Sequence, residues 1–204
     1  MSGLLKKLEV VYYSGKSSGI CTIHRRLSTI TAYVIPRPLL SQAKTLVGIE
    51  RPGVYFLLNE TKDRKIKQIY VGKTKNGLVR LQTHSGADFW NKAILFLADS
   101  NTFTMDLVDG LEEYAIQRVA ACLPERTRNA CMPSACVQID DLPLIVEVFD
   151  EMQLILSMQG YPIELCTGKP LSANVTQTAS SVIYGDAHER ELAFVSAQGI
   201  YCHM

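Results

Sequence analysis

Two short apolar segments joined by a polar turn constrain the fold of this chain more than any other feature. They are GVYFLLN at 53–59 and KQIYVG at 67–72, with ETKDRK at 60–65 in the connection. Runs of this length and composition, bounded by charged residues, are typical of β-strands. A short polar connection makes the two strands antiparallel neighbours. The sequence therefore predicts a sheet built around this hairpin.

Alternation along the hairpin separates its side chains into two faces. One face carries Val54, Phe56, Leu58, Ile69 and Val71. Tyr55 and Tyr70 fall on the opposite face of the same hairpin. We therefore expect the two phenols to lie side by side on the less apolar side of the hairpin.

The rest of the chain divides into predicted strands and helices. Apolar runs predict strands at 8–13, 31–36 and 91–98, with a turn and a short helical segment at 18–27. Helices are predicted at 38–46, 78–84, about 104–123 and about 141–159. Their apolar stripes are Val108, Leu111, Ala115, Val119 and Cys122 in the third helix, and Leu144, Val148, Met152 and Ile155 in the fourth. We expect an α/β (α+β) fold, with a small mixed sheet formed by the hairpin and the strand at 91–98 and flanked by helices.

Charge is distributed unevenly along the chain, although the net charge is only +1. Residues 1–80 hold 15 Lys or Arg and 4 Asp or Glu, a net of +11; residues 81–204 hold 6 and 16, a net of −10. A basic half is typical of proteins that bind phosphates, because each neutralised phosphate releases a counterion. Lysines and arginines also solvate exposed surfaces, so the imbalance favours a polyanionic partner without requiring one.

Cysteine spacing and hydropathy argue against several classes of protein. The six cysteines form no CxxC pair, which argues against a zinc site and favours reduced thiols in the cytoplasm. The longest apolar runs, such as 93–98, are far shorter than the ~20 residues that a membrane span needs. The first residues lack the apolar stretch and cleavage site of a signal peptide. We expect a cytoplasmic protein without a membrane partner.

Several polar residues follow the hairpin in a regular order. Arg80 lies ten residues after Tyr70 and His84 four residues after Arg80, so Arg80 and His84 share one flank of the predicted helix. Glu112 lies in LEEYAI on the long predicted helix, and Asn129 follows that helix. These residue types are the ones that acid–base and phosphate chemistry uses.

This order, with the tripeptides GVY at 53–55 and YVG at 70–72, resembles the GIY-YIG nucleases over about residues 51–132. Val54 and Val71 stand where the family signature has isoleucine. The resemblance extends to a bacterial subgroup with an N-terminal extension and a C-terminal helix. It implies four segments: a basic extension at 1–50, a GIY-YIG-like nuclease domain at 51–135, a C-terminal helix packed on the core at 136–165, and a linker and tail at 166–204.

The resemblance implies a divalent-metal-dependent endonuclease that hydrolyses phosphodiester bonds of DNA, with RNA as an alternative substrate. The implied catalytic residues are Tyr55, Tyr70, Lys73, Arg80, His84, Glu112 and Asn129. Glu112 would hold one Mg²⁺ or Mn²⁺ ion, which keeps most of its water ligands. Arg80 would grip a phosphate oxygen with its directed donors, and Lys73 would add positive charge nearby.

The proton transfers would involve the aromatic residues. Tyr55 or Tyr70 would act as the base, which requires that nearby cations lower a phenol pKa of ~10. His84 would either relay a proton to that phenol or donate to the phosphate. Asn129 would orient Glu112 or a tyrosine.

Four basic residues are candidate nucleic-acid contacts outside the catalytic set: Arg25, Arg26, Arg37 and Lys75. Contacts of this kind hold the phosphate backbone without reading its sequence. Each candidate could instead have a structural role, as strand tyrosines, surface ion pairs and helix-end histidines commonly do. Two other functions stay open: a nucleic-acid-binding module that does not cleave, and an interaction domain that dimerises through 141–159. The sequence leaves the oligomeric state undetermined.

Overall fold

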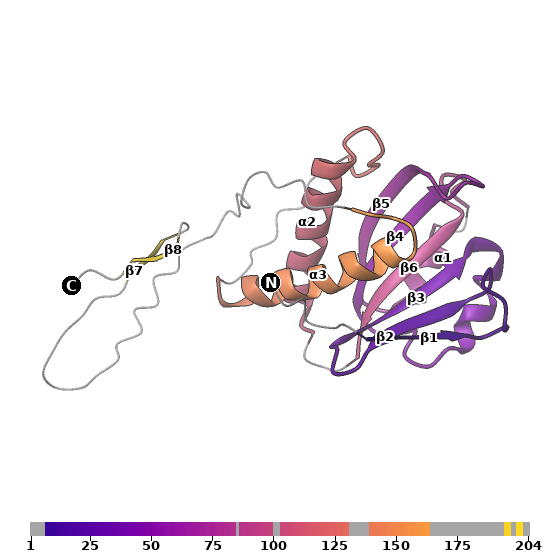
Figure 1. Ribbon diagram of the computed structural model, residues 1–204, viewed down its shortest axis with the longest axis horizontal. Helices are drawn as coiled ribbons and strands as arrows, with labels where there is room; N and C mark the ends of the chain where they lie inside the picture. Colours follow the sequence, from indigo (N-terminus) through magenta and orange to yellow (C-terminus); the bar gives the residue numbers. More distant parts are fainter. Residues whose placement is uncertain are drawn as a thin grey trace, which may run out of the picture.

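The computed structural model describes residues 7–84, 86–99, 103–130, 139–163, 194–196 and 199–201 (Figure 1). Its main strands are β1 (Leu8–Tyr12), β2 (Cys21–Arg25), β3 (Ile30–Pro36), β4 (Gly53–Glu60), β5 (Ile66–Thr74) and β6 (Lys92–Ala98). Its helices are α1 (Leu78–Gln82), α2 (Met105–Cys122) and α3 (Leu142–Met158), with 3₁₀ turns η1 (Arg37–Leu39), η2 (Gln42–Thr45) and η3 (Ile139–Asp141). A separate hairpin consists of β7 (Phe194–Ser196) and β8 (Gly199–Tyr201). The α+β class is confirmed.

The main sheet has six strands in the order β1-β2-β3-β6-β4-β5, and every neighbouring pair is antiparallel. It is therefore larger than the small mixed sheet that we expected. The difference lies in the first 36 residues, whose three strands continue the sheet beyond β6. The helical segment expected at 18–27 was wrong, because Cys21 and Ile23 alternate with Thr22 and His24 in β2. That strand pairs with a neighbour on each side.

The expected hairpin is confirmed, since β4 pairs with β5 in antiparallel register. Phe56 faces Val71 across it and Tyr55 faces Gly72. The two faces pack into two different cores. The first core contains Phe56 and Val71 together with apolar residues of α2 and α3. The second contains Tyr55 with residues of α1 and of the η1–η2 region. Both faces carry apolar residues, and the face of Tyr55 and Tyr70 packs into the smaller of the two cores, in line with the expectation that it is the less apolar one.

Helices α2 and α3 cross one face of the sheet, and α1 lies on the other (Figure 1). Thr104 caps α2 by accepting a hydrogen bond from the Leu107 amide. The predicted stripe of α2 is buried from Val108 to Val119. In α3 the buried face includes Ile145, while Leu144 is 37% exposed, so the stripe begins one residue later than predicted.

The segment predicted as one helix at 38–46 forms the two 3₁₀ turns η1 and η2 instead.

Gly160 follows α3 with a φ of +89°, the left-handed conformation expected just beyond a helix. Tyr161 is buried beside it, and its hydroxyl donates to Glu60 and accepts from the Lys92 ammonium at 2.7 Å. The apolar face of α3 also packs within the chain, since Ile145, Val148, Met152 and Ile155 are buried in the first core. Little of this face is therefore left for the dimerisation considered above.

Among the residues that the model describes, no helix is long and apolar enough to cross a membrane. Cys21 is a buried thiol that forms no disulfide. Four of the other five cysteines and the linker at 166–193 lie outside the described residues.

Candidate active site

The predicted aromatic residues meet on the α1 side of the hairpin. The ring centroids of Tyr55 and Tyr70 are 6.3 Å apart, and the His84 ring lies 5.9 Å from Tyr55 and 5.6 Å from Tyr70. The Tyr55 hydroxyl and His84 Nε2 share a hydrogen bond of 3.0 Å. Tyr55 is fully buried, whereas Tyr70 is half-buried. The hairpin and the residues just after α1 therefore bring two phenols and an imidazole together.

Gly72 leaves the space that the Tyr55 ring occupies. A Cβ atom at this position would lie 2.5 Å from the Tyr55 hydroxyl oxygen and 3.0 Å from Cε1 of Tyr70. A Cβ atom essentially never lies closer than 3.0 Å to an atom of another residue, so the Tyr55 hydroxyl excludes a side chain at this position. Position 72 of the YVG tripeptide is therefore a glycine for a steric reason: the Tyr55 side chain, which comes from β4, lies directly over it on β5.

Trp90 binds the backbone of His84. The Trp90 indole N–H donates to the His84 carbonyl at 2.9 Å, and Trp90 is itself 1% exposed. The guanidinium of Arg37 lies over the indole ring, 5.1 Å from its centroid. This buried support fixes the end of α1 and with it the position of the imidazole.

Burial determines the protonation states of Tyr55 and His84, the hydrogen-bonded pair. It raises the pKa of Tyr55 well above its ordinary value of 10.0; Tyr70 adds to the effect, and Arg80 opposes it through its charge and a hydrogen bond. Burial also lowers the pKa of His84 below 6.5, and the positive charge of Arg80 adds to that shift. At neutral pH the pair is therefore a neutral phenol bonded to a neutral imidazole. The expectation that cations would lower the phenol pKa does not hold for Tyr55.

Glu112 reaches the edge of β5 from helix α2. Its Oε1 accepts a hydrogen bond from the backbone N–H of Lys73 at 2.9 Å, and its Oε2 lies 3.4 Å from the Lys73 ammonium. Burial raises the pKa of Glu112, while Lys73 opposes the shift. The charge of Glu112 raises the pKa of Tyr55, and the charge of Arg80 lowers it. The acidic group and the aromatic group therefore lie within electrostatic range of each other.

Asp109 is a member of this cluster that the sequence analysis missed. Its Oδ1 lies 3.0 Å from the Lys73 ammonium, whereas Oε2 of Glu112 lies 3.4 Å from it. The available signal was the spacing of Asp109 and Glu112, one helical turn apart on the flank that faces β5. Within the described part of the chain, no three His, Cys, Asp or Glu side chains gather as a metal-binding group.

Asn129 has a different set of partners from those expected. Its side chain accepts from the Val71 amide at 3.0 Å and donates to the Val71 carbonyl at 2.8 Å. It therefore binds the outer edge of β5 and contacts the backbone between Tyr70 and Gly72. Its hydrogen bonds go to neither Glu112 nor a tyrosine side chain, so any orienting effect on Tyr70 acts through the strand.

The four predicted nucleic-acid contacts separate into two groups. Arg25 forms an ion pair with the buried Glu151 of α3, in which its Nε and Nη2 both approach the carboxylate oxygen Oε2, at 2.8 and 2.7 Å. Arg37 donates to the Trp90 carbonyl at 3.0 Å as well as lying over its ring. Both arginines thus have structural partners. Arg26 and Lys75 are exposed and stay candidates.

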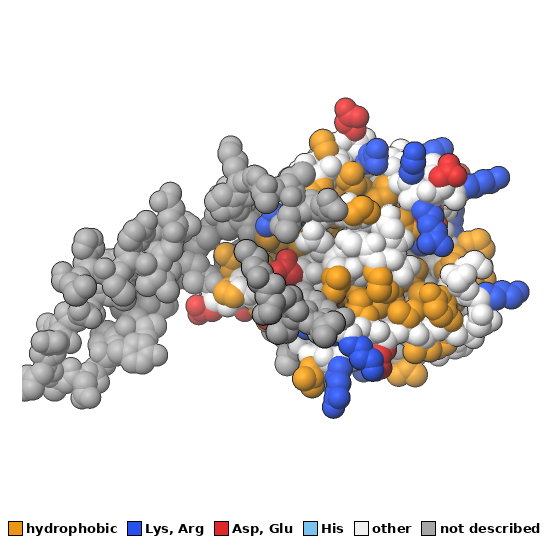
Figure 2. Space-filling view, in the orientation of Figure 1, with side chains coloured by type: hydrophobic (Ala, Val, Ile, Leu, Met, Phe, Trp, Pro, Cys, Tyr) orange, Lys and Arg blue, Asp and Glu red, His pale blue; other side chains and the backbone are white. Residues whose placement is uncertain are grey.

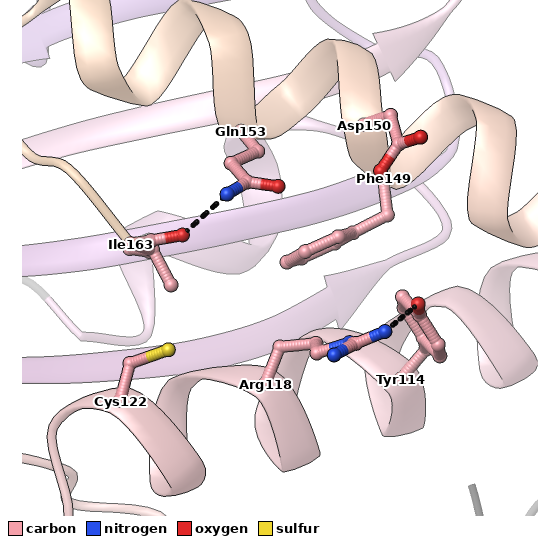
Figure 3. Close-up of a pocket in the computed structure, with 7 residues that line it drawn as sticks. All are labelled: Tyr114, Arg118, Cys122, Phe149, Asp150, Gln153 and Ile163. Carbon is pink, nitrogen blue, oxygen red and sulfur yellow. Dashed lines mark hydrogen bonds between the residues drawn. The ribbon is translucent and has the colours of Figure 1, made fainter. Parts of the chain in front are cut away.

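Two hollows lie outside the aromatic cluster. An open groove of about 430 Å³ runs between the η1–η2 region and the end of α1, lined by Arg37, Pro38, Leu40, Ser41, Lys44 and Gln82. A cavity between α2 and α3 is drawn in Figure 3, where Arg118 bonds the Tyr114 hydroxyl and Gln153 bonds the Ile163 carbonyl. Its volume of about 10 Å³ has room for only about one water molecule. Of these two hollows in the described part of the chain, the groove is by far the larger.

Figure 2 views the face covered by α2 and α3, where the Lys and Arg side chains lie mainly around the rim. Comparison of the chain with protein-family models, with curated proteins and with solved structures gave no match. The chemistry of the site therefore has to be inferred from its own residues.

Proposed function

We propose that this protein is a cytoplasmic, divalent-metal-dependent endonuclease of the GIY-YIG type, which hydrolyses phosphodiester bonds of DNA. The observation that carries the proposal is the convergence on one side of the hairpin of Tyr55, Tyr70 and His84, with Arg80 and Glu112 in electrostatic range. These residues are spread over 58 positions of the sequence, from 55 to 112. Together these groups could supply the proton acceptor, the positive charge and the carboxylate that phosphodiester hydrolysis needs.

Glu112 would hold the metal ion in this proposal. Its Oε1 is anchored by a backbone N–H, which leaves Oε2 as the oxygen that a cation could bind. A single carboxylate suits Mg²⁺, because that ion retains several of its water ligands. When bound, the ion would supply positive charge at the phosphate and at the leaving oxygen.

The Tyr55–His84 pair would carry the proton of the attacking water. The phenol oxygen would take that proton while the phenol proton passes to His84 Nε2, so no tyrosinate forms and an imidazolium results. Such a relay fits a phenol with a raised pKa and an imidazole with a lowered one, because both start neutral. The water oxygen then bonds to phosphorus as the bond to the leaving oxygen breaks.

Arg80, which is exposed, and Tyr70, which is half-buried, would meet the nucleic acid. The guanidinium offers directed donors to the phosphoryl oxygens, where negative charge builds in the transition state. The groove beside α1, with Arg37 and Lys44 on its wall, offers a path for the adjoining strand. The substrate would thus cross the α1 side of the molecule.

A nucleic-acid-binding module that does not cleave is the second candidate. It is favoured by the complete burial of Tyr55 and by the contact of both Glu112 oxygens with Lys73. In that case the same cations would hold phosphates, and the buried groups would only stabilise the hairpin.

Cleavage of supercoiled plasmid with Mg²⁺ or Mn²⁺ tests the proposal, using Glu112→Gln and Glu113→Gln as a matched pair. The amide at 112 keeps the size of the side chain and the acceptor for the Lys73 amide but loses the charge that binds the metal. We expect E112Q to lose cleavage by a factor of at least ~10², as is typical when one electrostatic group of a site is removed. E113Q should cleave as wild type does, because its position is about 100° further round the helix. Binding of the same DNA without metal should be unchanged in both. Absence of metal-dependent cleavage by the wild-type protein, with DNA binding retained, would establish the non-cleaving module.

A further inference from the structure

The Lys73 ammonium is shared between two carboxylates of α2. Its Nζ lies 3.0 Å from Asp109 Oδ1 and 3.4 Å from Glu112 Oε2. The ammonium therefore lies against Oε2 of Glu112, the oxygen that does not accept from the Lys73 backbone amide.

This occupancy conflicts with a metal ion at the same oxygen. A divalent cation on Glu112 Oε2 would lie within a few ångströms of the ammonium, and like charges at that distance repel strongly in a partly buried site. Glu112 has a side chain that is only 12% exposed, so the ammonium cannot remain there beside the ion. It needs a second anionic partner close by.

We infer that Asp109 is a positioning residue that holds the Lys73 ammonium when a metal ion occupies Glu112. The inference rests on the proposed metal role of Glu112. The carboxylate of Asp109 is already the nearer partner of the ammonium, at 3.0 Å against 3.4 Å for Glu112, so the ammonium stays paired when it turns away from Glu112.

The backbone of Lys73 makes this transfer possible without moving the metal ligand. The Lys73 amide donates to Glu112 Oε1 at 2.9 Å, and this bond is independent of where the ammonium points. Glu112 thus stays fixed to β5 while its other oxygen is freed. Asp109 keeps the positive charge near the phosphate site without placing it on the metal ligand.

Manganese affinity, measured by electron paramagnetic resonance of free Mn²⁺ without nucleic acid, tests the inference in a double-mutant cycle. The variants are Asp109→Asn, Lys73→Gln and the double variant, with Asp106→Asn as the control for loss of one carboxylate on the same helix. We expect D109N to weaken Mn²⁺ binding ~10-fold or more, as changes around metal ligands typically do. K73Q should strengthen binding, because it removes the competing ammonium. In the K73Q background, D109N should then change the affinity less than about twofold, the size expected of uncoupled sites.

The inference is overturned if D109N weakens Mn²⁺ binding equally with and without Lys73, which would make Asp109 a direct ligand. It is also overturned if D109N behaves as D106N does, since the effect would then be one of general charge. E112Q separates these results from a failure of the proposed function. If E112Q binds Mn²⁺ as well as wild type does, Glu112 is not the ligand, and the proposed metal site fails together with this role of Asp109.

Discussion

Gly72 shows how one missing side chain can shape a site. The Tyr55 ring passes so close to this residue that its hydroxyl oxygen and Cζ lie 2.5 and 2.6 Å from where a Cβ would be. Tyr55 has no room to retreat, because it is fully buried among the residues of the second core. The geometry of the phenol–imidazole pair therefore depends on a glycine that takes no part in the chemistry.

Gly72→Ala is expected to lower the free energy of unfolding by about 1–3 kcal/mol, the usual cost of overpacking a core. It should also displace Tyr55 from His84, because the ring is the nearest group that can move. Urea unfolding measures the first effect, and the NMR shifts of the His84 ring report the second. Gly86→Ala is the control, since nothing lies within 4 Å of a Cβ there. Equal stability of the two variants would contradict the close approach at Gly72.

His84 should set the pH dependence of cleavage. Only a neutral imidazole can accept the phenol proton, and burial lowers the pKa of His84 below 6.5. The single-turnover rate should therefore rise with pH through a midpoint below 6.5 and level off by neutral pH. A rate that keeps rising through pH 8 to 10 would indicate a tyrosinate base in place of the relay.

The lowered pKa of His84 also predicts how the free energy of unfolding depends on pH. Because the folded protein binds the His84 proton less tightly than the unfolded chain does, the stabilisation from neutral His84 is complete above pH 6.5. It is lost as the pH falls from 6.5 through the lower folded pKa. His84→Gln should remove this part of the profile in urea unfolding at pH 5 to 8.

At the scale of elements, the edge of the sheet at β5 is covered by other parts of the chain. Strand β5 is covered by the segment after α2: the Ile69 amide donates to the Arg126 carbonyl, and the Arg128 amide donates to the Ile69 carbonyl. Asn129 continues this pairing by bonding both backbone groups of Val71 with its side chain. Glu112 then binds the Lys73 amide. The outer edge of β5 is thus satisfied by a loop, an amide side chain and a carboxylate in succession, which holds the strand that carries Tyr70.

Asn129→Ala should lower the free energy of unfolding by about 1–3 kcal/mol for each Val71 group that it leaves unpaired. Asn129→Asp is the matched comparison, because it keeps the acceptor for the Val71 amide but cannot donate to the carbonyl. We expect its stability to lie between those of wild type and N129A. Hydrogen exchange at the Val71 amide should quicken in N129A. Exchange at the wild-type rate, with unchanged stability, would mean that water replaces the side chain fully.

At the scale of the whole molecule, the separation of charge along the sequence is partly cancelled by folding. Four cations of the basic half pair with carboxylates of the acidic half: Arg25 with Glu151, Arg37 with Asp88, Arg51 with Asp99, and Lys73 with Asp109 and Glu112. The net of +11 over residues 1–80 is therefore not a single basic surface. Arg26 and Lys75 follow β2 and β5, which run in the same direction, so both lie at the same end of the sheet.

Arg26→Glu and Lys75→Glu should each weaken DNA binding to a similar extent for any sequence, because contacts to the phosphate backbone carry no base information. Each should lower the slope of log affinity against log salt by about 0.9, the value for one phosphate contact on duplex DNA. Arg26→Lys should bind as wild type does, since a point charge suffices. Arg25→Glu is unsuitable as a probe of binding, because breaking its buried ion pair should cost about 3–5 kcal/mol of stability. Affinity that is insensitive to salt and to both reversals would exclude backbone binding at this end of the sheet.

Local periodicity determined the hairpin, its two faces and the helices that flank it, because alternation of 2 and of 3.6 residues is set by neighbours along the chain. It failed at β2, a short strand whose structure depends on partners on both sides. The residues of the candidate site could be named from their order in the sequence, but their partners could not. Arg25 and Glu151 are 126 positions apart, and Asn129 and Val71 are 58 apart. Such pairs are selected by the packing of α2 and α3 on the sheet and by the cost of burying a polar group unpaired. Only the tertiary structure therefore decided that Asp109 shares Lys73, that Asn129 binds the strand edge, and that burial keeps Tyr55 protonated.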